Sequence, residues 1–344
     1  MQVDPAVTDR ITKALNFEEP DRVPIWESLQ NGAVYEHFAP GVPFPECAAI
    51  ACAELGIDAT YGCMAPVQEL GDVGGMVHAG GTVWGVDPVF RSLSDLRDHR
   101  SDEPDAAAIE EQTLAGHERM QELYGPRVMY LPQCGGCGLL PGYDTQTFTV
   151  VATAIQEDIS ALKRFWDSRV EHAVTWSEVI ARHRLAPVVQ YCEDVAFKTG
   201  LMVSRDLLQQ EFFPRMKRII APLKAVGIKA IWHSDGDITD VLDDAVDCGF
   251  DGINPVDPSA GMDIGAIRKR FGRKLILVGN VGADHVLSRG TPDEVRADVR
   301  RCLRDAGGGG GHLLQCGDGQ VMPDCPLENV IAYCEEARRS RGSV

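Results

Sequence analysis

Short apolar runs alternate with longer segments of helical periodicity through the second half of this chain. Each run has the length of a buried strand and is followed by polar residues and then by an amphipathic segment. The runs begin near Ala186, Ala230, Gly252, Lys274 and His312. Strands that are apolar on both faces and alternate with helices are typical of a parallel sheet covered on both sides. The pattern therefore predicts an α/β protein.

The first half shows the same alternation less clearly. We expect a helix over Thr8–Leu15, a first strand over Arg22–Trp26 and a later strand over Arg127–Pro132. Residues 58–83 are rich in glycine and methionine with little periodicity, which favours loops and short strands. No glycine-rich dinucleotide motif follows an early strand, so a doubly wound sheet is disfavoured. We predict a single (β/α)8 barrel domain over residues 1–344, with an N-terminal helical extension.

Charge and composition narrow the class of protein. The 344 residues include 33 Lys and Arg against 51 Asp and Glu, a net charge of -18. An acidic surface of this kind repels phosphate backbones and anionic membranes, so neither is expected as a partner. The sequence shows no signal peptide and no apolar run of membrane-spanning length. Its 11 irregularly spaced cysteines fit free thiols or metal ligands of a cytoplasmic protein better than disulfides.

Polar side chains follow the predicted strands at their carboxyl ends. In a barrel these ends converge on one mouth, so residues distant in sequence meet there. We expect catalytic groups at Glu193, Asp235 and Asn280. Substrate contacts are expected at Glu27, Asn31, Tyr191 and Asn254.

Three of the strand-end residues also suit a metal ion. His233, Asp235 and Cys316 offer an imidazole, a carboxylate and a thiolate, which Zn²⁺ accepts in tetrahedral sites with one open position. In the plainer alternative, His233 hydrogen-bonds a neighbouring strand end and Cys316 is a small buried apolar residue. Cys134 and Cys137 have metal or redox spacing, but without a second pair nearby a structural loop is the default.

The run of five glycines at Gly307–Gly311 does not have the context of a phosphate-binding loop. Such a loop follows a strand and opens a helix, whereas this run follows a predicted helix and opens a strand. We expect it to be a flexible surface connection.

Four segments together resemble the uroporphyrinogen decarboxylase superfamily. They are ITKALNFEEPDRVPI near the start, CEDVAFKTGLMVSRDLLQQEFFPRMKRI from Cys192, HSDGDITDVLDDAVDCGFDGINPVDPSAGMD from His233, and VMPDCPLENVIAYCEEAR near the end. The resemblance covers nearly the whole chain and implies a (β/α)8 barrel with its site at the mouth. True decarboxylases of the superfamily carry an Arg-rich loop after the first strand, whereas WESLQNGAVYEHF at this place contains no Arg or Lys. The sequence is more similar to the corrinoid-dependent methyltransferase branch.

That branch implies an activity, cofactors and partners. Its members move methyl groups between a cobalamin-carrying corrinoid protein and an acceptor such as a thiol or tetrahydrofolate, in some cases within an O-demethylase system, and are often homodimers. Thiol-methylating members hold zinc with an H-x-C pair and a distal Cys. Here the pair reads His233-Ser234-Asp235, and Cys316 stands for the distal Cys, with Asp318 as the alternative ligand.

Two other functions remain open at this stage. The first is a carboxy-lyase for a small or tetrapyrrole carboxylic acid, in which an Asp or His at the mouth protonates a carbanion. The second is a barrel without catalytic activity that binds a small molecule or serves as an accessory subunit.

Overall fold

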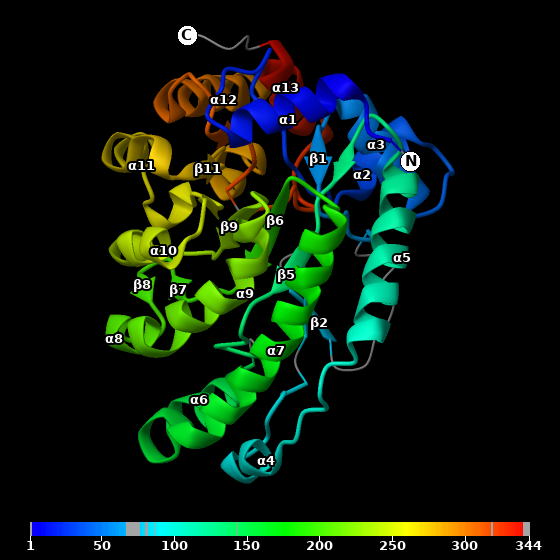
Figure 1. The fold of residues 1–344 in the computed structure, drawn as a ribbon. Coiled ribbons are helices and arrows are strands. Elements are labelled where there is room, and N and C mark those ends of the chain that lie inside the picture. Colours follow the sequence, from blue (N-terminus) through cyan, green and yellow to red (C-terminus); the bar gives the residue numbers. More distant parts are fainter. Residues whose placement is uncertain are drawn as a thin grey trace.

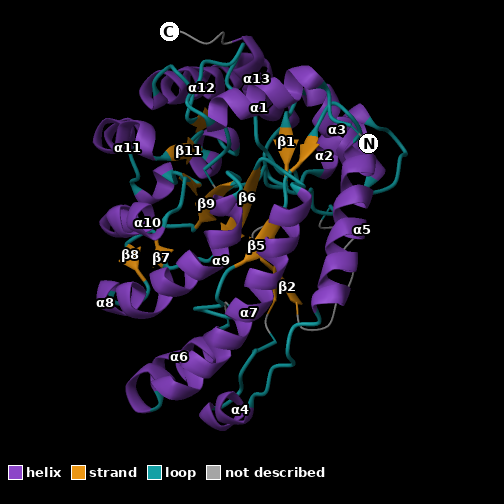
Figure 2. Cartoon of the chain, viewed as in Figure 1, coloured by secondary structure: helices purple, strands orange, loops and turns teal. Residues whose placement is uncertain are grey.

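Strands lie in the interior of the molecule with helices around them (Figures 1 and 2), and the parallel pairing of the strands joins them into a ring. The structure is a computed structural model that describes residues 2–66, 76–79, 82–85, 87–142, 144–317 and 319–339. Its largest sheet has the strand order β12-β11-β10-β9-β6-β5, and all neighbours are parallel. These strands are β5 (Gln133–Gly135), β6 (Val188–Cys192), β9 (Lys229–His233), β10 (Gly252–Asn254), β11 (Ile276–Val278) and β12 (His312–Leu313).

The remaining strand segments close the ring. β1 (Ala59–Thr60) pairs in parallel with β4 (Met129–Tyr130), which leads directly into β5. The strand predicted over Arg22–Trp26 forms only isolated parallel bridges. Trp26 pairs with Ala59 on one side, and Ile25 pairs with Leu314 on the other. The backbone N–H of Trp26 donates to the Leu314 carbonyl at 3.0 Å. The predicted (β/α)8 barrel is therefore confirmed.

Helices connect the strands and cover the outside of the barrel. They are α2 (Gly32–Phe38), α3 (Glu46–Leu55), α4 (Leu93–Asp98), α5 (Ala106–Tyr124), α6 (Thr145–Glu157), α7 (Ile159–His183), α8 (Arg205–Leu207), α9 (Phe213–Ala225), α10 (Leu242–Cys248), α11 (Ile264–Phe271), α12 (Pro292–Ala306) and α13 (Leu327–Arg339). Two antiparallel hairpins join β2 (Met76–Ala79) to β3 (Thr82–Gly85) and β7 (Ala196–Phe197) to β8 (Gly200–Leu201). Within the described residues no helix is long and apolar enough to cross a membrane.

The N-terminal extension packs on the interior of the ring. Helix α1 (Pro5–Leu15) begins at Pro5 rather than Thr8, because Asp4 caps it by accepting the Ala6 N–H at 2.8 Å. Its buried side chains, among them Ile11 and Leu15, belong to the same apolar cluster as inward-facing strand residues. A second, larger cluster fills the space between strands and outer helices. The barrel is thus a packed core, and α1 is part of it.

A buried carboxylate also joins α1 to the barrel. Asp58, at the start of β1, is 2% exposed and accepts hydrogen bonds from Arg10 and Arg22, each at 2.6 Å. Its Oδ2 also accepts the backbone N–H of Ile25 at 2.9 Å. The carboxylate is therefore fully surrounded by donors from α1 and the first strand.

The glycine run is packed against neighbouring chain, which corrects the expectation of a flexible connection. Gly310 and Gly311 both have positive φ, and a Cβ atom at either would lie within 2.4 Å of atoms of Glu18 or Phe17. The Gly311 N–H donates to the carbonyl of Ala14 at 2.7 Å. Glycine is required here because the backbone passes directly over the loop that follows α1.

Candidate functional site

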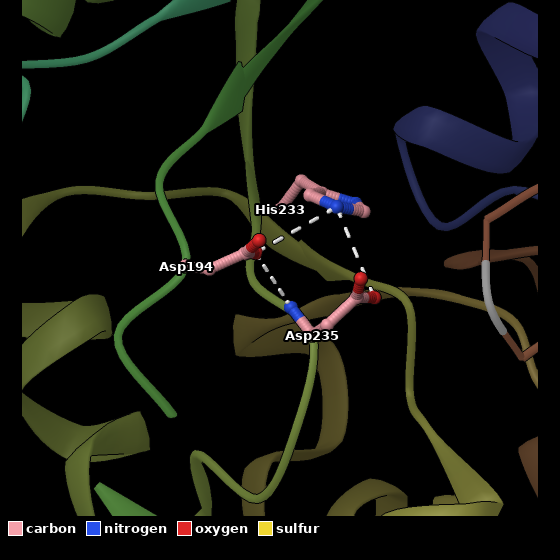
Figure 3. A group of neighbouring side chains, drawn as sticks. All are labelled: Asp194, His233 and Asp235. Carbon is pink, nitrogen blue, oxygen red and sulfur yellow. Dashed lines mark hydrogen bonds and ion pairs between the residues drawn. The ribbon is translucent and has the colours of Figure 1, made fainter. Parts of the chain in front are cut away.

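Adjacent strands bring three potential ligands together at the mouth of the barrel. β6 and β9 pair in parallel with Cys192 opposite His233, so Asp194, two residues after β6, comes beside the end of β9. Ligand atoms of Asp194, His233 and Asp235 lie within 4.8 Å of one another (Figure 3). In the part of the chain that the structure describes, this is the one group of three or more such residues.

The two carboxylates face the same nitrogen of the imidazole ring. His233 Nε2 lies 3.8 Å from Asp194 Oδ1 and 3.9 Å from Asp235 Oδ1. The backbone N–H of Asp235 donates to Asp194 Oδ1 at 2.9 Å, which holds the two aspartates together. Asp235 Oδ1 is buried and has no hydrogen-bond partner, although the side chain as a whole is 51% exposed. An oxygen in that position needs a proton or a cation.

Burial and neighbouring charge raise the pKa of Asp235. Its value rises to about 6, mainly because burial disfavours the charged form. His233 acts in the opposite direction, and the carboxylates of Asp194 and Asp257 add to the rise. Negative charge is therefore concentrated at this point of the mouth.

A chain of amide side chains fixes the proton on the His233 ring. The carbonyl oxygen of Gly319 can only accept a hydrogen bond, so the Gln315 side chain must donate from Nε2. The distance between Nε2 and this oxygen is 2.9 Å. Gln315 Oε1 then accepts from Asn254 Nδ2, which leaves Asn254 Oδ1 toward the ring. Gln190 Nε2 donates to the same Oδ1 at 3.1 Å. Each amide orientation follows from the one before it.

The imidazole at the end of this chain has one defined neutral tautomer. His233 Nδ1 lies 2.6 Å from Asn254 Oδ1, which is an acceptor, so Nδ1 carries the proton. Nε2 then holds the lone pair and faces both carboxylates. A ligand imidazole whose other nitrogen donates to an oxygen is the usual arrangement in metal sites. One nitrogen and two carboxylates form a donor set that Zn²⁺ accepts with a position left for substrate.

Cys316 and Glu27 meet each other outside this group. The Cys316 thiol lies 3.6 Å from Glu27 Oε1, and its backbone N–H donates to Glu27 Oε2 at 3.0 Å. Tyr333 donates its hydroxyl to the same Oε2 at 3.0 Å. Burial raises the pKa of Glu27 to about 7. Asp318, the alternative ligand, lies outside the described residues, and the ligand role of Cys316 stays a prediction.

Glu193 points toward the loop that follows β5. Its carboxylate accepts the backbone N–H groups of Gly138 and Leu139, the latter at 3.1 Å. Burial raises its pKa to about 7. Cys134 lies in β5 and Cys137 in this loop, and burial also raises the pKa of the Cys134 thiol, to about 12. This supports the structural reading of the loop, in which neither thiol is prepared to act as a thiolate.

Three other predicted residues make contacts with the outer layer. Tyr191 shares a hydrogen bond of 2.6 Å with Ser177 of α7. Asn280 Oδ1 accepts from Arg301 of α12 at 3.1 Å. Asn31 caps α2 by accepting the Val34 N–H and also donates to the carbonyls of Met322 and Cys325. Their roles in catalysis and substrate binding stay predictions, whereas Asn254 lies at the site as the partner of His233.

Sequence reasoning passed over Asp194, Gln190 and Gln315. Asp194 follows a predicted strand, as Glu193 does. Which of these two carboxylates lies at the site depends on the direction in which each side chain points, and the sequence does not give that direction. Gln190, in the middle of β6, and Gln315, which follows β12, are fully buried polar residues. A buried amide needs partners, which is the signal that could have indicated them.

Comparison with known proteins identifies the family. The model of the family described as uroporphyrinogen decarboxylase (URO-D) matches residues 134–340, more than half of the chain. The chain belongs to the uroporphyrinogen decarboxylase family. The resemblance predicted from the sequence, including that to the corrinoid-dependent methyltransferase branch, is confirmed by this match and by the following relatives.

Curated relatives include both activities of the superfamily. The chain is 28% identical over 166 residues to methylcobamide:CoM methyltransferase MtaA of Methanosarcina barkeri, which covers 48% of this chain and 45% of that protein. It is 36% identical over 94 residues to the uroporphyrinogen decarboxylase of Methylococcus capsulatus, covering 27% and 25%. The matches thus span less than half the length of these relatives.

A solved structure resembles the entire fold. A methyltransferase from Methanosarcina mazei superposes with a TM-score of 0.71 at 21% identity, over 97% of this chain and 98% of that one. This likeness shows that the two chains share one fold over nearly their whole length.

Proposed function

We propose that this protein transfers a methyl group between a corrinoid carrier protein and a small acceptor, a thiol or tetrahydrofolate. Support comes from the similarity to methylcobamide:CoM methyltransferase. The observation on which the proposal depends is the group of Asp194, His233 and Asp235, whose imidazole lone pair faces two carboxylates at the mouth. A tetrahydrofolate acceptor would place the protein in an O-demethylase system. The cytoplasmic location and the homodimer belong to the same proposal.

Zinc is the metal that these residues suit. Asp194, His233 and Asp235 would hold it, with Asn254 keeping the ring in position. When bound, zinc lowers the pKa of a coordinated thiol or water and acts as a Lewis acid. Two carboxylates in place of thiolates make the donor set harder than that of an H-x-C site. The buried, unpartnered Oδ1 of Asp235 supports a cation at this place.

The mouth favours methyl transfer over decarboxylation of a polycarboxylate. The segment after the first strand contains no Lys or Arg, and Glu27 and Asn31 within it are buried and engaged with the protein itself. Asp194 and Asp235 add negative charge beside it. A substrate with many carboxylates would meet repulsion beside these aspartates, and the segment after the first strand offers it no cationic partner.

The test is a methyl-transfer assay with purified, zinc-supplied protein. Methylcobalamin and 3-mercaptopropionate are mixed; the cobalt–carbon bond breaks, a carbon–sulfur bond forms, both electrons of the broken bond stay on cobalt as cob(I)alamin, and the thiol proton passes to solvent. Formation of cob(I)alamin is followed by absorbance. We expect transfer by the wild type, and a loss of more than about 100-fold in kcat/KM in Asp194→Asn and His233→Ala.

The matched control is Asp247→Asn, which changes an exposed carboxylate on α10. It should retain wild-type activity. Absence of transfer to any thiol or folate acceptor, and in the reverse direction, would contradict the proposal. Release of CO₂ from a tetrapyrrole carboxylic acid would support the lyase instead.

A further inference from the structure

A cavity extends from the candidate site to a cationic side chain on α7. Its volume is about 620 Å³, and its wall includes Asp194, Glu193, Gly138 and Arg169. Arg169 also lines a neighbouring cavity of about 410 Å³, together with Trp176 and Tyr130. Because Asp194 belongs both to the cavity and to the ligand group, a molecule in this cavity can reach the site.

The guanidinium of Arg169 lies along the glycine loop after β5. A Cβ atom at Gly138 would be 3.7 Å from Arg169 Nε, and one at Gly135 would be 4.0 Å from Nη2. Both positions lack side chains, so the loop leaves this guanidinium uncovered. Arg169 is exposed, and it lines both cavities.

Three acidic residues near Arg169 are engaged with other groups, whereas Asp102, which is exposed, also lines the cavity. Asp167 pairs with Arg215 of α9 at 2.7 Å, and Glu171 pairs with Arg218 at 2.7 Å. Glu193 uses its carboxylate on the backbone of Gly138 and Leu139. Within the described residues no hydrogen bond or ion pair is formed by the Arg169 side chain. Its fork of donors is therefore available to a ligand.

The wall of the cavity carries charges of both signs, which would orient a ligand. Asp102, Glu193 and Asp194 are its acidic residues and Arg169 is its arginine, and apolar side chains such as Phe165 and Leu140 line the same wall. An oxyanion would be repelled from the aspartates and attracted to the guanidinium, which binds carboxylates with two parallel hydrogen bonds. The far end of such a molecule would then face the ligand group.

We propose that Arg169 binds the oxyanion, such as a carboxylate, of a small bifunctional acceptor whose reactive end lies at Asp194, His233 and Asp235. The role of this molecule as methyl acceptor rests on the proposed function, whereas its binding does not. The protein is thus selective for acceptors that carry a negative charge away from the reacting atom.

Calorimetric titration with a matched pair of probes tests this inference. 3-Mercaptopropionate carries a thiol and a carboxylate, and 3-mercapto-1-propanol replaces the carboxylate with an uncharged hydroxymethyl group. We expect wild-type protein to bind the acid more tightly than the alcohol. In Arg169→Gln the affinity for the acid should fall about 10- to 100-fold, the factor for loss of a charge-assisted hydrogen bond, with that for the alcohol unchanged. Arg169→Lys should retain part of the preference.

Arg164→Gln is the control, since Arg164 is an exposed arginine on the same helix and lines neither cavity. It should bind both probes as the wild type does. Equal binding of acid and alcohol by the wild type, no binding of either, or unchanged binding in Arg169→Gln would overturn the inference. If the wild type transfers methyl groups but Arg169→Gln binds the acid as tightly as the wild type does, the role of Arg169 is wrong and the proposed function stands. If binding of the acid depends on Arg169 but the wild type transfers no methyl group, the proposed function is wrong and the role of Arg169 stands.

Discussion

At the scale of single residues, the state of the His233 ring depends on amides from other strands. Asn254 holds Nδ1 at 2.6 Å, and Gln315 and the Gly319 carbonyl fix the orientation of Asn254. Without this partner the ring could rotate or present N–H to the carboxylates. The metal affinity of the group is therefore sensitive to a residue that is not itself a ligand.

We predict that Asn254→Ala weakens zinc binding by about 10- to 100-fold, the usual effect of losing a hydrogen bond that orients a ligand. Competition titration with a chromophoric chelator measures the affinity. Asn16→Ala, an exposed asparagine after α1 at the other end of the barrel, should bind zinc as the wild type does. Equal affinities in all three proteins would show that Asn254 does not orient the ligand.

The sequence predicted part of this site, and residue-scale geometry explains the rest. The position after a strand predicts His233, Asp235 and Asn254, and the pairing of β6, β9 and β10 does bring them together. The same rule predicts Tyr191 and Asn280, yet their side chains contact α7 and α12. Side chains alternate between the faces of a strand, so a choice between neighbours needs the register, which one sequence does not provide.

At the scale of elements, the Asp58 network links α1, the first strand and β1. Asp58 is buried between Arg10 and Arg22, whose side chains are 11% and 14% exposed. Removing the negative charge leaves the largely buried Arg22 without its carboxylate partner and Arg10 with only Asp21, which is exposed. Breaking a buried ion pair in this way costs far more than an exposed pair contributes. The attachment of the N-terminal helix should therefore depend strongly on this one carboxylate.

We predict that Asp58→Asn lowers the free energy of unfolding by about 3–5 kcal/mol, the range for breaking a buried ion pair. Urea denaturation followed by circular dichroism gives the value. Asp9→Asn, which removes an exposed carboxylate that pairs with Lys13, should change it by less than about 1 kcal/mol. Similar effects of both substitutions would mean that the network does not stabilise the extension.

Elements were easier to predict from the sequence than connections. The helix predicted over Thr8–Leu15 ends at Leu15 in the structure and begins three residues earlier, after the Asp4 cap. The glycine run was misjudged because its tight packing against Phe17 and Glu18 depends on contacts between distant segments. Such contacts leave no periodic pattern in the sequence.

At the scale of the whole molecule, a buried histidine makes the free energy of unfolding depend on pH. His312 on β12 is 3% exposed, and its Nε2 donates to the Gly279 carbonyl at 2.6 Å. Burial lowers the pKa of His312 from 6.5 to about 4. The folded state thus resists protonation at pH values where the unfolded chain accepts a proton. This stabilisation is complete above pH 6.5 and is lost as the pH falls toward 4.

We predict that this histidine accounts for roughly 3 kcal/mol of the stability lost between pH 7 and pH 4. His312→Gln keeps an N–H donor but does not titrate, so its free energy of unfolding should fall less over this range. Urea denaturation at several pH values measures the difference. His37→Gln, an exposed change, should follow the wild type. A parallel pH dependence in His312→Gln and wild type would contradict the prediction.

The chain of amides that ends on His233 has a consequence for protein engineering. Moving only Asp194, His233 and Asp235 into another barrel would transfer the donor atoms without the means of orienting them. The smallest portable unit of this site also includes Asn254, Gln190 and Gln315, with the carbonyl of Gly319 as its fixed reference. Its members come from β6, β9, β10 and the segment after β12, so the recipient must reproduce the strand register across that whole arc of the barrel.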